Sequence, residues 1–156
     1  MPKYKSRDER LIEKEYNLIL DSIVKTLGNE ITYNTDLHKN GLELFGNKFK
    51  GVYSSDKIPK LSKLQPYAII NLDKSSQPGS HWIAVAYSNK NDGIVVYDSF
   101  GRKSKKIIPS IYNVFNKVID TDYDAEQQLK EDNCGQRALA WLVIFDKYGV
   151  ENALLL

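Results

Sequence analysis

The fold of this chain is decided by residues 81–98, which read HWIAVAYSNKNDGIVVYD. Two runs rich in β-branched and aromatic residues, 82–87 and 94–97, flank a turn of Asn, Lys, Asp and Gly at 89–93. Such runs are typical of strands, and a turn of this composition is typical of a hairpin. The stretch therefore predicts two antiparallel strands in the middle of a sheet.

The predicted hairpin brings two polar residues together at its open end. His81 precedes the first strand and Asp98 follows the second, 17 residues later (98 − 81). Their side chains can lie opposite each other or one diagonal step apart, whereas a register shifted by one residue would put them on opposite faces. A carboxylate bound to an imidazole fixes its tautomer and stabilises the imidazolium. Alone, each is as readily a strand-edge histidine or a turn aspartate; together they form a candidate proton-transfer pair.

The remaining pattern predicts helices around this hairpin, and one further strand on each side of it. The expected elements are a helix over 7–27 ended by Gly28, a short helix from Thr35 or Asp36 to about Phe45, a loop with short elements over 46–64, a strand over 67–72, a helix over 107–115, a short strand over 118–120 and a helix over 134–148. This order predicts one α+β domain over residues 1–156, with a small, mostly antiparallel central sheet flanked by helices.

Cys134 is the only cysteine of the chain, which excludes an intramolecular disulfide. Asp132 and Asn133 are favourable N-cap residues, so Cys134 is expected in the first turn of the last helix. The partial positive charge of a helix N-terminus stabilises a thiolate, which is the nucleophilic form of cysteine. Gly135 allows a substrate backbone to approach closely. The alternative interpretation is a small buried apolar residue, the usual environment of a free cysteine.

Gln128 lies six residues before Cys134 (134 − 128), in a polar segment. Its amide and the backbone N–H of Cys134 could together donate hydrogen bonds to a developing oxyanion. A glutamine in a polar loop has no significance by itself.

Composition excludes several classes of protein. The 156 residues carry 22 basic and 20 acidic side chains, a balance that does not indicate nucleic-acid binding, and the basic cluster at 102–106 is interpreted as solvated surface. A metal site would need carboxylates beside His38, His81 and Cys134, so no metal or cofactor is expected. No apolar run approaches the roughly 18 residues that span a membrane, and no secretory signal is visible. One cysteine fits a reducing compartment.

Three spaced motifs resemble a known superfamily. His81 and Trp82, then Tyr-Asp-Ser-Phe-Gly at 97–101, then two glutamines, five residues and Cys-Gly resemble the adenain-like and ubiquitin-like-protein-specific cysteine proteases. Further upstream, GVYSSDKIP at 51–59 is similar to the adenain-type proteases of viruses, virophages and Polinton-like elements. The resemblance covers about 67–148 and implies a papain-like, adenain-like fold with the nucleophile at a helix N-terminus.

The resemblance implies a cysteine endopeptidase that cleaves capsid and other virion precursors at Gly-containing sites during maturation. It implies that Cys134 is the nucleophile, His81 the base, Asp98 its partner and Gln128 the oxyanion residue. Trp82 matches a tryptophan that walls a narrow channel for glycines, although a core aromatic is an equal interpretation. We expect a monomer that acts in the virion and in the host cytoplasm (viral factory) or nucleus, with 67–148 as catalytic core and 1–28 as N-terminal helix.

Two alternatives remain open at this point. The same catalytic set serves deubiquitinase- and deSUMOylase-like deconjugating proteases, and a catalytically silent module could use the groove to bind a Gly-rich tail. Adenovirus adenain is activated by a viral peptide attached through a second cysteine, and this chain has none. Covalent activation of that kind is excluded, whereas a non-covalent activator or DNA, the oligomeric state and the role of the N-terminal helix are left open.

Overall fold

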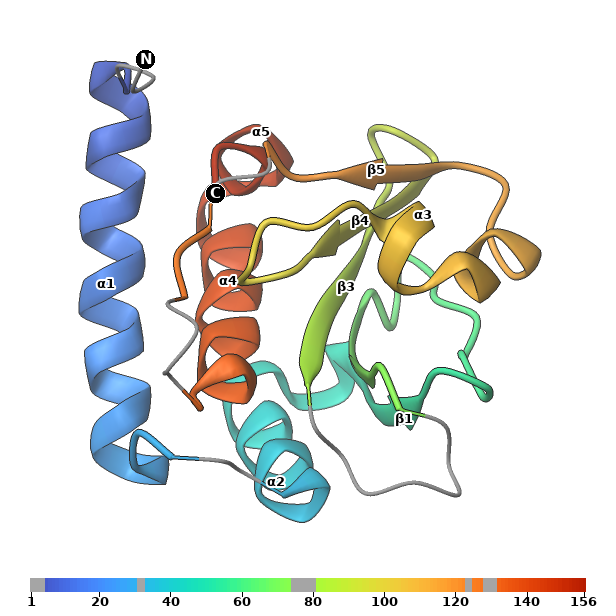
Figure 1. Ribbon diagram of the computed structural model, residues 1–156, viewed down its shortest axis with the longest axis horizontal. Helices are drawn as coiled ribbons and strands as arrows, with labels where there is room; N and C mark the ends of the chain where they lie inside the picture. Colours follow the sequence, from blue (N-terminus) through green and yellow to red (C-terminus); the bar gives the residue numbers. More distant parts are fainter. Residues whose placement is uncertain (1–4, 31–32, 74–80, 123–124, 128–131) are drawn as a thin grey trace.

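The computed structural model of the protein describes residues 5–30, 33–73, 81–122, 125–127 and 132–156. Five strands form one sheet in the order of the sequence: β1 (Phe49–Ser54), β2 (Tyr67–Asn71), β3 (Trp82–Ser88), β4 (Gly93–Tyr97) and β5 (Val118–Asp120). The α-helices are α1 (Arg7–Leu27), α2 (Asn34–Phe45), α3 (Ser104–Ile107), α4 (Cys134–Tyr148) and α5 (Val150–Leu154). The fold class is α+β, as predicted (Figure 1).

The sheet is mixed rather than mostly antiparallel. The inner pairs, β2 with β3 and β3 with β4, are antiparallel as predicted, but β1 pairs parallel with β2 and β5 parallel with β4. A parallel pair needs a crossover of about a dozen residues or more. Residues 55–66 provide it on one side and residues 98–117 on the other, so both outer strands enter in the direction of their neighbours.

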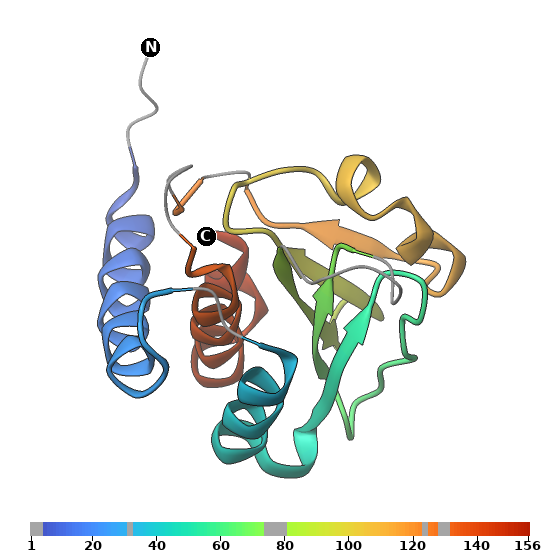
Figure 2. The same cartoon turned by 60° about the horizontal axis from the view of Figure 1, so that its bottom comes forward.

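The inner strands are buried on both faces, because helices cover one face and loops with short helices cover the other. Successive side chains of a strand point to opposite faces. In β4, Val95 and Tyr97 pack with α1 and α4, whereas Ile94 and Val96 pack with Ile111 beyond α3. The resulting layers are α1, α4, the sheet, and then the α3 segment (Figures 1 and 2).

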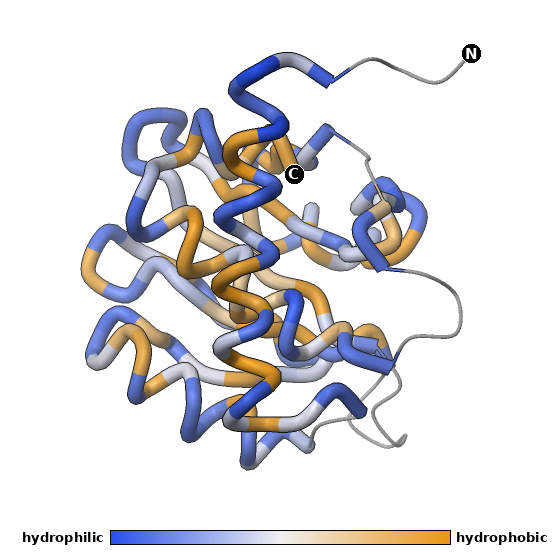
Figure 3. The backbone as a smooth tube through the Cα atoms, turned by 90° about the vertical axis from the view of Figure 1, so that its left-hand side faces the viewer, coloured by the Kyte–Doolittle hydropathy of each residue, from blue (hydrophilic) through white to orange (hydrophobic). Residues whose placement is uncertain are grey.

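The first helix follows the prediction closely. Ser6 accepts a hydrogen bond from the backbone N–H of Glu9 at its start, and Gly28, with φ 83°, ends it. The buried residues form one face of the helix at spacings of three and four: Ile12, Tyr16, Leu20 and Ile23. Figure 3 shows α1 running along the side of the molecule with hydrophilic and hydrophobic residues alternating along it. None of the helices described is long and apolar enough to cross a membrane.

One predicted element was wrong in detail, and one prediction was incomplete. Residues 107–115 do not form one helix, because α3 ends at Ile107 and a separate 3₁₀ helix begins at Pro109. Ile108 between them has φ −146° and ψ 64°, as expected where the following proline disfavours the helical conformation. The stretch 46–64, predicted as a loop with short elements, contains the whole of β1.

Candidate active site

The hairpin brings His81 and Asp98 into direct contact. Ala84 pairs with Tyr97, and continuing that register puts Asp98 opposite Ile83, one diagonal step from His81 on the same face. The Nε2 atom of His81 lies 2.6 Å from Oδ1 of Asp98. The side chains of His81 and Asp98 are only 11% and 1% exposed, so this contact is shielded from water.

Arg102 is a site residue that sequence reasoning missed. Its Nε and backbone N–H donate to Oδ2 of Asp98 at 2.8 and 3.1 Å, and its Nη2 lies 3.4 Å from Oδ1. The chain reverses here because Gly101 adopts φ 70° and donates to the carbonyl of Asp98. The spacing of four residues after an aspartate and the glycine between them were the available signal, but the basic cluster was interpreted as solvated surface.

These contacts decide the charge states of the pair. Burial opposes ionisation of Asp98, but hydrogen bonds from His81 and Arg102 outweigh it and lower the pKa of Asp98 to about 2. Burial also opposes a charged His81, yet the hydrogen bonds to Asp98 and Cys134 outweigh it and raise the pKa of His81. An ionised Asp98 can only accept, so Nε2 of His81 carries the proton and Nδ1 is the nitrogen available to the thiol.

Phe100 fixes the plane of the imidazole. Its ring stacks on His81 with centroids 5.0 Å apart and an interplanar angle of 26°. The Arg102 guanidinium lies over the Phe100 ring, 5.2 Å from its centroid. His81 is therefore held at its edge by a carboxylate and on its face by an aromatic ring.

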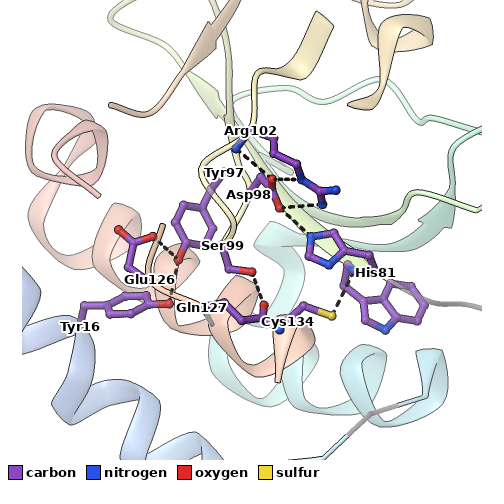
Figure 4. A network of polar contacts seen from close by, with 10 residues as sticks. Tyr16, His81, Tyr97, Asp98, Ser99, Arg102, Glu126, Gln127 and Cys134 are labelled. Carbon is purple, nitrogen blue, oxygen red and sulfur yellow. Dashed lines mark hydrogen bonds and ion pairs between the residues drawn. The ribbon is translucent and has the colours of Figure 1, made fainter. Parts of the chain in front are cut away.

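Cys134 is the first residue of α4, as predicted, and is 7% exposed. Its Sγ accepts a hydrogen bond from the backbone N–H of Trp82 at 3.4 Å (Figure 4). Asn133 occupies the N-cap position, as expected, although its side chain makes no cap hydrogen bond. A helix N-terminus and a backbone donor both favour a thiolate over a thiol.

Trp82 lies next to the thiol through its backbone rather than its ring. The side chain is 6% exposed and belongs to the hydrophobic cluster between the sheet and α4. This environment fits the interpretation as a core aromatic. The predicted wall of a glycine channel stays a prediction.

Gln128 lies outside the described residues, but its neighbour Gln127 lies beside the site. Gln127 is 5% exposed, and its Oε1 accepts a hydrogen bond from Ser99 Oγ at 2.5 Å. The carbonyl of Ser99 accepts from the backbone N–H groups of Glu126 and Gln127, each at 2.9 Å. Figure 4 shows the Gln127 amide between Ser99 and Cys134. Spacing to Cys134 selected Gln128, and the available signal for Gln127 was that it is the other member of the adjacent pair.

No group of three or more metal-binding side chains is assembled within the described part of the chain. The buried polar groups at the site bond to one another instead. What the arrangement offers chemically is a thiol at a helix N-terminus beside a buried imidazole that is oriented by a carboxylate.

The family profile of the adenovirus endoprotease matches residues 42–151, which is 110 of the 156 residues (151 − 42 + 1). The chain belongs to the adenovirus endoprotease family. This endoprotease is therefore a cysteine peptidase of a viral family, and proteins are its class of substrate, which confirms the predicted enzyme class. A search of curated proteins gave no match. The matched segment begins within α2, so α1 precedes it.

Proposed function

We propose that this endoprotease cleaves precursor proteins of a virion at Gly-containing sites during maturation, through an acyl-enzyme formed on Cys134. The observation that carries the proposal is the buried hydrogen bond between His81 and Asp98, beside a lone cysteine at the first residue of α4. Membership of the adenovirus endoprotease family supports the viral role. The assembling virion, in the host cytoplasm or nucleus, is the proposed site of action.

In the proposed mechanism the thiolate of Cys134 attacks the scissile carbonyl carbon. The imidazolium of His81 then protonates the leaving amine as the C–N bond breaks, which leaves a thioester on Cys134. Neutral His81 next removes a proton from water, and the hydroxide displaces the thiolate to give the carboxylate product. Asp98 stays ionised throughout and holds the productive tautomer of His81.

The developing oxyanion needs donors, and the backbone N–H of Cys134 is the first. Two adjacent glutamines are candidates for the second: Gln128 by its spacing and Gln127 by its contacts. Because Ser99 donates to the amide oxygen of Gln127, the NH₂ group of that amide is the end that can donate to substrate.

Comparing Gln127→Ala with Gln128→Ala separates these candidates. The variant that removes the donor loses roughly 10²–10³ in kcat with little change in substrate binding, as for other oxyanion donors. The other glutamine serves as the matched control. Rates near wild type in both variants would remove an amide from the mechanism and leave the backbone donor.

The function itself is tested with peptides built around Gly-Gly-X and Gly-X-Gly, virion precursor proteins, and folded ubiquitin-like precursors. We expect cleavage of peptides and virion precursors by the wild-type protein and none by Cys134→Ala, with an unchanged fold. Cleavage confined to ubiquitin-like precursors would replace the proposal by deconjugation. Equal activity of the Cys134→Ala variant would overturn the assigned nucleophile.

A further inference from the structure

The helix that precedes the family match contributes a buried hydroxyl behind the site. Tyr16 of α1 is fully buried, and its hydroxyl lies 2.8 Å from that of Tyr97 and 3.4 Å from Nη1 of Arg137. Tyr97 immediately precedes Asp98 in the chain, and Arg137 stands three residues after Cys134 in α4. The Tyr16 hydroxyl thus connects the last residue of β4, which precedes Asp98, to α4, which begins with Cys134.

The hydrogen bonds through Tyr16 run in one direction. Tyr97 donates to Oε2 of Glu126 at 3.2 Å, so the shared proton between the two hydroxyls comes from Tyr16. Arg137 in turn donates to Tyr16. Burial raises the pKa of both tyrosines, which keeps both hydroxyls protonated. Figure 4 shows the part of this line that runs from Tyr16 through Tyr97 to Glu126. Hydrogen bonds that connect a buried cation through two hydroxyls to a carboxylate polarise one another, which makes the line stiff.

The same arginine continues the line to the residue before the nucleophile. Nε of Arg137 donates to Oδ1 of Asn133 at 3.0 Å, and Nδ2 of Asn133 donates to Oδ1 of Asn29 at 2.8 Å. Gln136, which immediately precedes Arg137, donates from Nε2 to the carbonyl oxygens of Gly28 and Glu30, each at 2.8 Å. The N-terminal part of α4 is therefore hydrogen-bonded both to α1 and to residues 28–30, which follow α1.

We propose that Tyr16 is a positioning residue, which sets the separation between the strand that carries Asp98 and the helix turn that carries Cys134. The inference rests on the proposed function of Cys134 and His81. Apolar contacts between α1 and α4 are non-directional and tolerate small slides, whereas hydrogen bonds depend steeply on distance and angle. A displacement of about 1 Å in a reacting group can cost up to 10²-fold in rate.

The test removes one oxygen atom with Tyr16→Phe. The matched control is Tyr67→Phe, because Tyr67 is also buried and donates to Oδ1 of Asp146 at 2.7 Å, towards the other end of α4. Two quantities are measured for each protein: the rate at which iodoacetamide alkylates Cys134 as a function of pH, and kcat and KM on a cleaved peptide. Circular dichroism and thermal melting verify the fold.

For Tyr16→Phe we expect alkylation of Cys134 near neutral pH to slow about tenfold. The value of kcat should fall about tenfold while KM stays within about twofold, since alignment rather than binding is lost. Tyr67→Phe should lower Tm to a similar extent and leave the alkylation profile and kcat unchanged.

A second variant, Asn29→Ala, breaks the line at an exposed residue without touching the core, and should slow alkylation in the same direction by a smaller factor. If Tyr16→Phe lowers Tm but leaves alkylation and kcat unchanged, Tyr16 is merely structural and the inference is overturned. Alkylation needs no substrate, so slowed alkylation by Tyr16→Phe in a protein that cleaves none of the tested substrates would sustain the positioning role while the proposed function fails.

Discussion

On the histidine side of the site, His81 and Arg102 are 21 positions apart in the sequence (102 − 81), and each bonds directly to Asp98. On the cysteine side, Asn133 and Arg137 bond to residues of the N-terminal segment that are 104 and 121 positions away. The first half is one hairpin and the turn after it, so it is a local unit. The second half acquires its geometry from the docking of α1. Substitutions on the histidine side should therefore change chemistry more than folding, whereas those on the cysteine side should change both.

The largest expected effect is that of Asp98→Asn on the histidine side. Loss of the carboxylate removes the acceptor that fixes the His81 tautomer, so kcat/KM should fall by about 10²–10⁴. Asp146→Asn is the matched control. Asp146 lies in α4 towards the end away from the thiol, and its carboxylate accepts hydrogen bonds from Tyr67 and Lys48. A kcat/KM within threefold of wild type would show that the local unit is not needed for catalysis.

The pH dependence of stability should distinguish the two halves. The pKa of Asp98 is lowered from 3.8 to about 2, so its contribution of roughly 2 kcal/mol is present above pH ~4 and lost as pH falls towards 2. The raised pKa of His81 gives a contribution that is present below its ordinary pKa of about 6.5 and lost as pH rises through the folded value. The pKa values of Tyr16 and Tyr97 are also raised, so their contribution to the free energy of unfolding is present below pH ~10 and is lost only above it.

Urea unfolding of wild type and Asp98→Asn across this range measures the effect. The difference in unfolding free energy should be largest between pH ~4 and ~6.5, where both partners of the pair are charged in the folded state. A difference that is flat from acid to neutral pH would mean that the pair is not ionised as described.

A smaller effect is expected from Arg102→Gln. The variant removes the planar donor to Asp98, so the pKa of Asp98 should rise and kcat/KM should fall about tenfold with an altered acid limb. Lysine at this position should rescue only part of the loss, because an ammonium group cannot reproduce the bidentate geometry. Full rescue by lysine would reduce the role of Arg102 to its charge.

The smallest expected effect belongs to Ser99→Ala. Without the hydroxyl, Gln127 loses the partner that fixes its amide, and kcat should fall by roughly three- to tenfold, about the value of one hydrogen bond. The loss should disappear when Gln127 is already alanine, because the two residues then act as a unit. Ser110→Ala, which removes a hydroxyl bonded to the carbonyl of Ser55, is the control and should leave kcat unchanged.

The parts of the fold that could be predicted from sequence are those fixed by neighbouring residues. The hairpin, α1 and α4 follow from local periodicity and turn composition, and the hairpin register is what brings His81 to Asp98. β1 was not predicted, since its six residues contain Gly51 at φ 139° and Lys50 rather than an alternating apolar pattern. The break at Pro109 was also underestimated, because proline is tolerated in a first turn but ends the helix before it.

The parts of the site that could not be predicted depend on contacts that no local pattern encodes. Arg102 lies in a basic stretch whose composition is typical of a surface turn. Its role follows only from the burial of Asp98, to which it donates. Gln127 and Gln128 are adjacent in a polar segment without helix or strand periodicity, so no local pattern tells which side chain faces the thiol. Tyr16 reads as one apolar position of an amphipathic helix, and its hydroxyl acquires partners only when α1 docks on α4.

The docking of α1 also has a consequence in time. A ribosome makes Tyr16 long before Arg137, and 121 residues separate them (137 − 16). Contacts so distant in sequence close late, because the intervening chain must first be ordered. The hairpin with His81 and Asp98 can form on the nascent chain, but Tyr16 cannot contact the turn that holds Cys134 until α4 has been synthesised.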